Sequence, residues 1–147
     1  MKELIERMKV VLADSFAFYL KAHYYHWNVE GINFPQYHSF FETIYSEVYG
    51  SIDAIAEHIR TLDAYAPGSF GRFKELSNIS DETSVPSAVM MCQRLMKDNE
   101  TLISDLTYAY TEAEKEKQLG LANFLQDRID AHKKHGWWLR ASAKKIG

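Results

Sequence analysis

Five side chains of the kinds that bind divalent metal ions follow one another in the first part of the chain: His26, His38, Glu42, Asp53 and Glu57. Asp53 and Glu57 are four residues apart, so on a helix they share a face. Glu42 precedes Asp53 by three helical turns and points the same way. At the rise of an α-helix it nevertheless lies roughly 16 Å from Asp53 along the axis. These five residues therefore cannot all meet within one molecule.

The two histidines belong near Glu42. His26 precedes a helix-breaking stretch, residues 30–35, that turns the chain between two helices, and His38 follows it directly. The two half-sites thus lie at opposite ends of one helix face. Two copies of that helix packed antiparallel about a two-fold axis would complete both half-sites. We therefore expect a metal site built between subunits.

The composition indicates one globular domain over residues 1–147, long enough to bury a core without disulfides. Hydrophobic residues make up 46% of the chain and aromatic residues 14%, which favours additional buried surface between subunits. The net charge of −3 argues against a protein that holds nucleic acid by bulk electrostatics. A single cysteine, Cys92, fits a reducing cytosol. With no signal peptide and no membrane-spanning run evident, we expect a soluble, cytoplasmic protein.

Apolar residues recur at helical spacing in four long segments and nowhere alternate with the period of a strand. The predicted helices cover residues 4–28, about 35–64, 84 to about 111, and a last segment that carries Leu121 to Ala143. Ser84, two residues before Pro86, is the predicted start of the third helix. A short segment, residues 70–76, could form one or two further turns. The predicted fold class is all-α.

The lengths of the connections predict the topology. The first and third joins are short and should make antiparallel neighbours, whereas residues 65–83 are long enough to cross the bundle lengthwise. Two antiparallel hairpins joined by one long crossover are typical of the ferritin-like four-helix bundle. The short segment at residues 70–76 would lie in that crossover.

Imidazoles and carboxylates without a cysteine cluster suit iron, manganese or zinc. Acids at helical spacing are common on surfaces, and any one of the five residues alone is more often not a ligand. A metal site is favoured because the three acids lie on one helix face and both histidines lie at one end of that face. Four-helix di-iron proteins usually carry Glu-x-x-His within their own bundle, and this motif is absent here. Its absence weakens the intramolecular alternative, and with it a haem-binding bacterioferritin-like protein.

The chain strongly resembles the Dps family of mini-ferritins over nearly its whole length. The motifs that carry the resemblance are residues 21–31 (KAHYYHWNVEG), Asn33-Phe34, His38, residues 53–60 (DAIAEHIR), Ala66-Pro67-Gly68 and residues 134–140 (KHGWWLR). The His-Trp-Asn motif, the second histidine twelve residues on and the Asp-x-x-Ala-Glu motif form a specific combination.

The resemblance implies a ferroxidase centre shared by two subunits. Its ligands would be His26, His38 and Glu42 of one subunit together with Asp53 and Glu57 of the two-fold mate. It also implies a hollow homododecamer that oxidises ferrous iron, with hydrogen peroxide in preference to O2, and stores the ferric product. Trp27 would intercept stray oxidising equivalents near the iron. The alternative is a nucleoid-associated DNA-binding protein of the same fold with little ferroxidase activity.

Two further features bear on partners. Asn123, Asp127 and Asp130 fall on one face near the start of the last helix, where the family lines its iron-entry pores. Family members that bind DNA often do so through a lysine-rich N-terminal tail, which this sequence lacks. Its C-terminal end offers Lys144 and Lys145, and DNA binding is therefore doubtful.

The remaining histidines favour packing over metal binding. His23 lies on the apolar stripe one turn before His26, and we expect a hydrogen-bonded core histidine. His132 and His135 follow the core stripe of the last helix. His58 points about 100° away from Glu57 and is expected at the surface or in an interface.

Overall fold

The computed structural model describes residues 1–144, which form five helices and contain no strand. The helices are α1 (Lys2–Asn28), α2 (Phe34–Thr61), α3 (Phe70–Leu76), α4 (Ala88–Lys115) and α5 (Leu119–Ala143). The all-α fold class and the short helix in the crossover are thus confirmed. No helix within residues 1–144 is long and apolar enough to cross a membrane.

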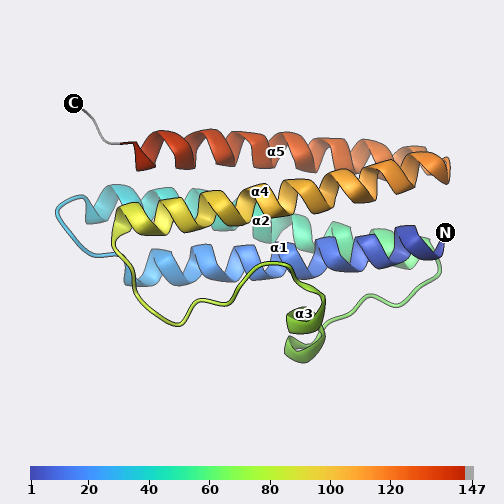
Figure 1. The fold of residues 1–147 in the computed structure, drawn as a ribbon, viewed down its shortest axis with the longest axis horizontal. Coiled ribbons are helices and arrows are strands. Elements are labelled where there is room, and N and C mark those ends of the chain that lie inside the picture. The colour runs from blue at the N-terminus through green and yellow to red at the C-terminus, as the bar shows by residue number, and fades with distance from the viewer. Residues whose placement is uncertain (145–147) are drawn as a thin grey trace.

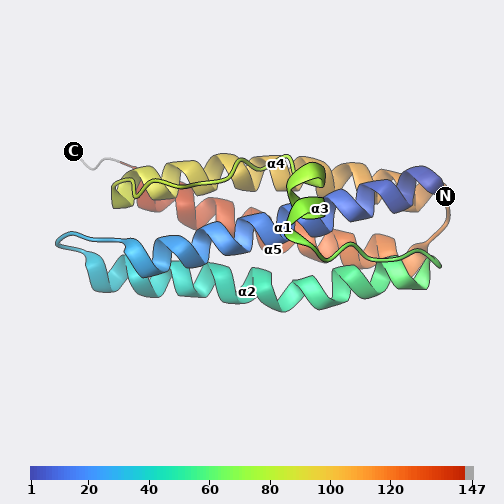
Figure 2. The same cartoon turned by 90° about the horizontal axis from the view of Figure 1, so that it is seen from below.

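Four long helices lie side by side as two antiparallel hairpins, α1 with α2 and α4 with α5 (Figure 1). The crossover from α2 to α4 runs back along the outside of the bundle and carries α3, which packs against α1 (Figure 2). The predicted ferritin-like topology is confirmed, and it places the first and second halves of the chain around one common core.

The core consists of the apolar stripes that the sequence predicted. Its large buried side chains include Phe18, Tyr25 and Phe41, and every long helix contributes to it. Leu20 and Val89 also lie at the helical spacing of these stripes, but each is 39% exposed. Leu20 faces the groove between α1 and α3, and Val89 lies in the first turn of α4, at the end of the bundle.

The predicted start of the third long helix is wrong by four residues. The helix α4 begins at Ala88, after Ser87, whose hydroxyl oxygen accepts a hydrogen bond from the Met90 amide. Ser84 belongs to the crossover, where its carbonyl oxygen accepts a hydrogen bond from the Tyr24 hydroxyl at 2.8 Å. The Ser84 hydroxyl donates to Glu82 at 2.8 Å and so does not accept from a helix amide.

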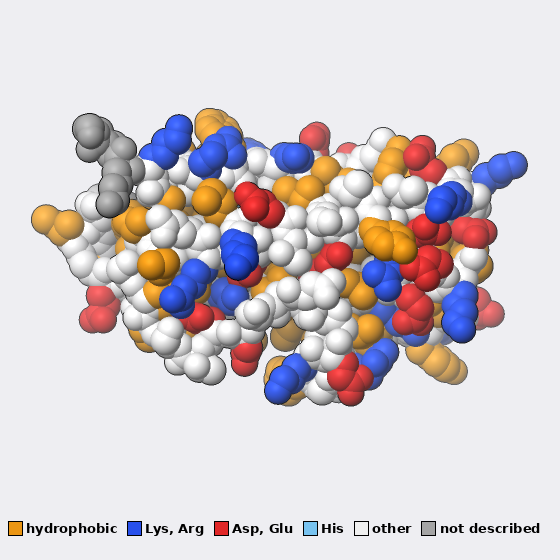
Figure 3. All heavy atoms as spheres, viewed as in Figure 1, with side chains coloured by type: hydrophobic (Ala, Val, Ile, Leu, Met, Phe, Trp, Pro, Cys, Tyr) orange, Lys and Arg blue, Asp and Glu red, His pale blue; other side chains and the backbone are white. Residues whose placement is uncertain are grey.

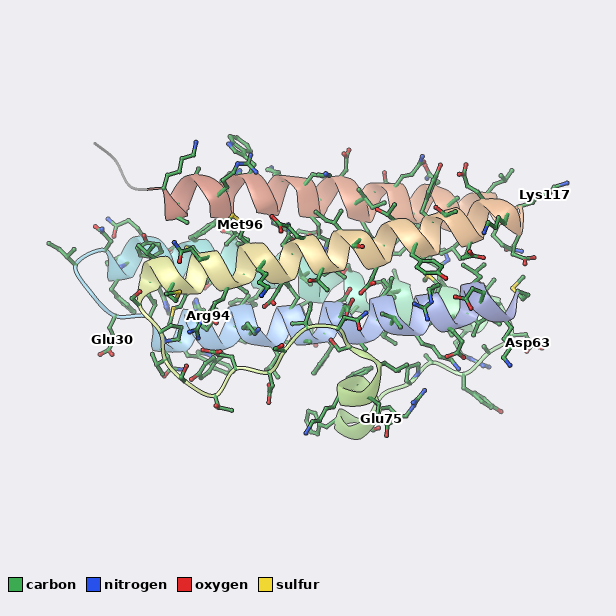
Figure 4. The ribbon with its side chains drawn as sticks, viewed as in Figure 1. Glu30, Asp63, Glu75, Arg94, Met96 and Lys117 are labelled. Atoms are coloured by element: carbon green, nitrogen blue, oxygen red, sulfur yellow. The ribbon has the colours of Figure 1, made fainter. Side chains whose placement is uncertain are left out.

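Two other helix ends differ from the prediction. The helix α2 ends at Thr61 because the chain turns through Asp63, which has a φ of 64°. The helix α4 continues to Lys115, and the turn into α5 passes through Lys117, with a φ of 56°. Asp63 and Lys117 lie at the same end of the bundle, opposite Glu30 in the α1–α2 loop (Figure 4).

The crossover is fastened to the bundle by a buried carboxyl group. Asp14 on α1 is fully buried, and its Oδ1 accepts hydrogen bonds from the Ser77 hydroxyl at 2.9 Å and the Asn78 amide at 2.8 Å. The Asn78 side chain in turn donates to Asp105 on α4 at 3.0 Å. Burial and the neighbouring Asp105 raise the pKa of Asp14 to about 8.

Candidate metal centre

The end of α1 and the start of α2 bring His26 and His38 together. Gly31, with a φ of 125°, allows the tight turn between the two helices. The Nδ1 of His26 bonds the carbonyl oxygen of His38 at 2.7 Å, and the Nδ1 of His38 bonds the carbonyl oxygen of His26 at 2.7 Å. The two rings are stacked, with centroids 3.7 Å apart. Each histidine therefore holds the other in place.

These reciprocal bonds fix which nitrogen of each ring can bind a metal. A carbonyl oxygen only accepts hydrogen bonds, so each Nδ1 must carry the proton that it donates. In the neutral ring, Nε2 then keeps a free lone pair. The Nε2 of His26 lies 3.9 Å from Oε1 of Glu42, one turn further along α2 than His38. Two oriented imidazoles beside a carboxylate form a donor set that suits ferrous iron.

The other two predicted ligands are on the same helix but far from this cluster. The helix α2 is unbroken from Phe34 to Thr61, so Asp53 lies roughly 16 Å and Glu57 roughly 22 Å beyond Glu42 along the axis. Both side chains are exposed. Within residues 1–144, no group of three or more His, Cys, Asp or Glu side chains is arranged to hold a metal ion. The half-site of His26, His38 and Glu42 therefore needs additional donors.

The half-site opens outward. The His26 side chain is only 9% exposed, whereas the Glu42 side chain is 58% exposed. The imidazole is thus shielded by the protein, and the carboxylate projects from its surface. A second molecule that approached this face could contribute ligands without displacing the core.

An aromatic cluster adjoins the half-site. Trp27 is 57% exposed and packs against His23, with ring centroids 4.1 Å apart. The ring of His23 stacks on Tyr45 at 3.8 Å, and its Nδ1 is hydrogen-bonded to the Tyr19 hydroxyl at 2.9 Å. Burial and the neighbouring His26 lower the pKa of His23. His23 is hydrogen-bonded, as the sequence predicted, although it is only half-buried.

A polar network between the helices, buried except at Glu47, was missed by sequence reasoning. Arg128 on α5 donates to both carboxylate oxygens of Glu47 on α2, at 2.6 and 3.0 Å, and Nε2 of His135 lies 2.7 Å from Glu47. His132 contacts Arg128 through Nε2 at 3.2 Å and bonds Asn99 on α4 through Nδ1 at 2.8 Å. The network joins α2, α4 and α5.

The charges of this network shift two pKa values. Burial alone raises the pKa of Glu47, but the hydrogen bonds from His135 and Arg128 outweigh it and hold that pKa well below its usual range. Burial and the Arg128 charge lower the pKa of His132. The sequence offered one signal of this network, because Arg128, His132 and His135 lie on the core-facing stripe of α5. Their partners on the other helices could not be identified without the fold.

The structure also shows the surroundings of His58 and of the three residues predicted to line an iron-entry pore. His58 is half-buried against Phe124 of the same chain, with ring centroids 4.6 Å apart, rather than turned to the surface. Asn123, Asp127 and Asp130 are all exposed on α5. Their role in an iron-entry pore stays a prediction.

Comparison with known proteins places this fold in a family. Residues 5–147 match the ferritin-like domain family. A low temperature-induced protein of Nostoc sp. is 36% identical over 132 residues, which cover 88% of this chain and 74% of the relative. The DNA protection during starvation protein of Brevibacillus brevis is 32% identical over 147 residues and covers 96% and 98% of the two chains.

A solved structure supports the same family assignment as these two relatives. The Dps protein of Vibrio cholerae, described as a member of a broad superfamily of ferritin-like diiron-carboxylate proteins, superimposes with a TM-score of 0.93 at 28% identity. The match covers 97% of this chain and 90% of that one. The molecule is thus a ferritin-like protein. Within that class, the chain belongs to the Dps family of mini-ferritins.

Proposed function

We propose that the protein is a ferroxidase and iron store that oxidises ferrous iron, with hydrogen peroxide as the preferred oxidant, and keeps the ferric product inside a homo-oligomeric shell. The catalytic site would lie between two subunits. His26, His38 and Glu42 of one subunit and Asp53 and Glu57 of its two-fold mate would bind the iron. Consuming ferrous iron and peroxide together would protect the cell from hydroxyl radicals.

The observation that carries this proposal is the reciprocal bonding of His26 and His38. It leaves the Nε2 atoms of both rings available to a metal, that of His26 3.9 Å from the exposed carboxylate of Glu42, in a cluster that lacks enough ligands of its own. Carboxylates added by a second subunit would complete the coordination and favour the harder ferric product. The family relationship supports iron as the ion.

Intersubunit complementation tests the site directly. The variants His38→Ala and Asp53→Ala should each lose peroxide-dependent ferrous oxidation. In a hetero-dimer of the two variants, one site carries both defects and the other carries neither. Refolding the variants together at equal concentration should therefore restore about a quarter of the wild-type sites.

A site within one subunit predicts a different result. Every subunit in the mixture would then carry one defect, and refolding the variants together would restore no activity. The matched control mixes His38→Ala with Glu42→Ala, both defects in the same half-site, and should stay inactive. Unchanged rates in either single variant would also contradict the assignment.

The second candidate, a DNA-binding shell, is favoured by the name of the Brevibacillus relative. Lysine and arginine side chains lie along the C-terminal half of α5 (Figure 3), among them Lys133, Lys134 and Arg140. Lys144 is exposed at the end of this row, and Lys145 lies outside the described residues. With a net charge of −3 on each subunit, we expect little retention of DNA at physiological salt.

A further inference from the structure

The crossover is held against the bundle at two points that differ in their chemistry. At the first point, Ser77 and Asn78 donate hydrogen bonds to Oδ1 of Asp14 on α1. At the second point, Glu82 forms an ion pair with Arg94 of α4. The second point thus joins opposite charges, whereas the first joins neutral donors to a buried acid.

One oxygen of that buried acid has no donor. The side chain of Asp14 is fully buried, and its Oδ2 has no hydrogen-bond partner within residues 1–144. The Asp105 carboxyl of α4 lies within hydrogen-bonding reach of the Asp14 carboxyl, and Nδ2 of Asn78 donates to Asp105 at 3.0 Å. Two ionised carboxylates only accept hydrogen bonds and repel each other. One of the two must therefore carry a proton for the pair to stay buried.

The surroundings of Asp14 favour the protonated form. Burial has the largest effect, and together with the neighbouring Asp105 it raises the pKa of Asp14 to about 8, although the hydrogen bonds from Asn78 and Ser77 act in the opposite direction. Of the groups in the described chain that act on this pKa, Asp105 is the one that can carry charge. None of them belongs to α2 or α3, the other helices that pack against α1.

We propose that the proton between Asp14 and Asp105 is a latch for the crossover, and that its loss lets residues 77–79 detach from the bundle. Detachment brings both carboxylates into water and ends their repulsion. The crossover stays attached at Glu82 through its ion pair with Arg94, so the opening is local. This inference is independent of the proposed ferroxidase function.

The residues that detach form part of one wall of a groove along α1. The groove has a volume of about 660 Å³, and Phe16, Ala17 and Leu20 contribute to its other wall. Ile79 is 8% exposed while the latch is closed. Release of residues 77–79 would widen the groove and expose apolar surface. The latch therefore makes the shape of this surface depend on pH.

The open state should become more populated as the pH rises. In the open state Asp14 is solvated and releases its proton above its ordinary pKa of 3.8, whereas the closed state keeps the proton up to about pH 8. Between these two values the closed state binds one proton more than the open state. The equilibrium constant for opening should therefore rise by up to about tenfold per pH unit and level off above pH 8.

Hydrogen exchange of the intact oligomer, followed by mass spectrometry, tests the latch. The Asn78 amide donates to Asp14 and is freed when the latch opens. After correction for the intrinsic exchange rate, protection of peptides covering residues 77–82 should fall by up to about tenfold per pH unit from pH 6 to pH 8. Peptides from the start of α4, where the Met90 amide is bonded to the Ser87 hydroxyl, should show no such fall.

Three variants separate the proton from the rest of the structure. Asp14→Asn keeps an acceptor for the two crossover donors but has no proton to lose, so protection of residues 77–82 should not change with pH. Asp81→Asn, the same substitution at an exposed acid of the crossover, should behave as the wild type. Asp105→Asn supplies an amide donor for Oδ2 of Asp14, and the fall in protection should level off at a lower pH.

Two kinds of result would overturn the latch. Wild-type protection that does not change with pH, or a pH dependence that persists in Asp14→Asn, would mean that this proton does not hold the crossover. Protection of residues 77–82 equal to that of peptides from the middle of α1 would mean that they are exposed only by global unfolding.

Discussion

Replacing Asp14 by asparagine should stabilise the protein, and increasingly so as the pH rises. Asp14 is fully buried, and its pKa of about 8 lies far above the value of 3.8 for a solvated aspartate. The folded state therefore keeps a proton that the unfolded chain releases. The stability from this group is fully present below pH 4 and is lost as the pH rises through 8.

The size of the effect follows from this linkage. Between the two pKa values the folded state binds one proton more than the unfolded state, so the free energy of unfolding falls by roughly 1.4 kcal/mol per pH unit. From pH 6 to pH 8 the wild type should lose about 2–3 kcal/mol through this group alone. An asparagine carries no such proton.

Asparagine also preserves the contacts that Asp14 makes. Its side-chain oxygen can accept from Ser77 and from the Asn78 amide, as Oδ1 does now. Its NH2 group replaces Oδ2, which has no hydrogen-bond partner within the described structure, and can donate toward Asp105. The substitution thus resembles a permanently protonated Asp14 and should leave the crossover fastened to α1 and α4.

The assay is guanidinium unfolding of wild type and Asp14→Asn at pH 6, 7, 8 and 9, at one subunit concentration because the protein is expected to be an oligomer. The difference between the two proteins cancels the other titrating groups. It should grow up to pH 8 and level off above it. Glu100→Gln, at an exposed acid on α4, is the control. A difference that does not change with pH would refute the reasoning.

Four further results are expected. Arg128→Met should lower the free energy of unfolding by roughly 1–2 kcal/mol in denaturant titrations, because the partly exposed Glu47 would lose both hydrogen bonds from Arg128 and keep only its contact with His135, and adding Glu47→Met should recover part of the loss. Asp127→Asn should slow iron uptake, followed by absorbance, without changing the mass of the assembly, since it weakens a negative potential at the predicted pore. Cys92, whose pKa burial raises to about 12, should react with thiol reagents only in denaturant. Gel shifts at physiological salt should show weak DNA retention, and a strong shift that is lost on removing residues 144–147 would contradict this.

The sequence predicted the elements and their order because each depends on local spacing. The apolar stripes gave the long helices, and the breaker at residues 30–35 predicted that His26 and His38 would lie near each other, as they do. Prediction was less successful for helix ends that depend on contacts outside the helix. The helix α4 begins after Ser87, whose hydroxyl accepts from an amide, whereas Ser84 lies in the crossover, where its carbonyl oxygen accepts from Tyr24 and its hydroxyl donates to Glu82.

The network around Arg128 could not be predicted for the same reason. Glu47 precedes Arg128 by 81 residues, and nothing in its surroundings along the chain marks it as paired. The pairing becomes visible only when α2 and α5 are known to face each other. Likewise, Tyr45 and Tyr49 share a face of α2, but their contact with Tyr19 depends on how α1 and α2 pack.

The same network argues against a metal site in the interior of the bundle. Glu47, His132 and His135 converge between the helices and would themselves make a plausible donor set of one carboxylate and two imidazoles. The guanidinium of Arg128 already occupies both oxygens of Glu47 and contacts Nε2 of His132. A divalent cation would have to displace a buried, hydrogen-bonded positive charge, which costs several kcal/mol. The interior thus contains its own cation, and the imidazole nitrogens left for a metal ion are the Nε2 atoms of His26 and His38.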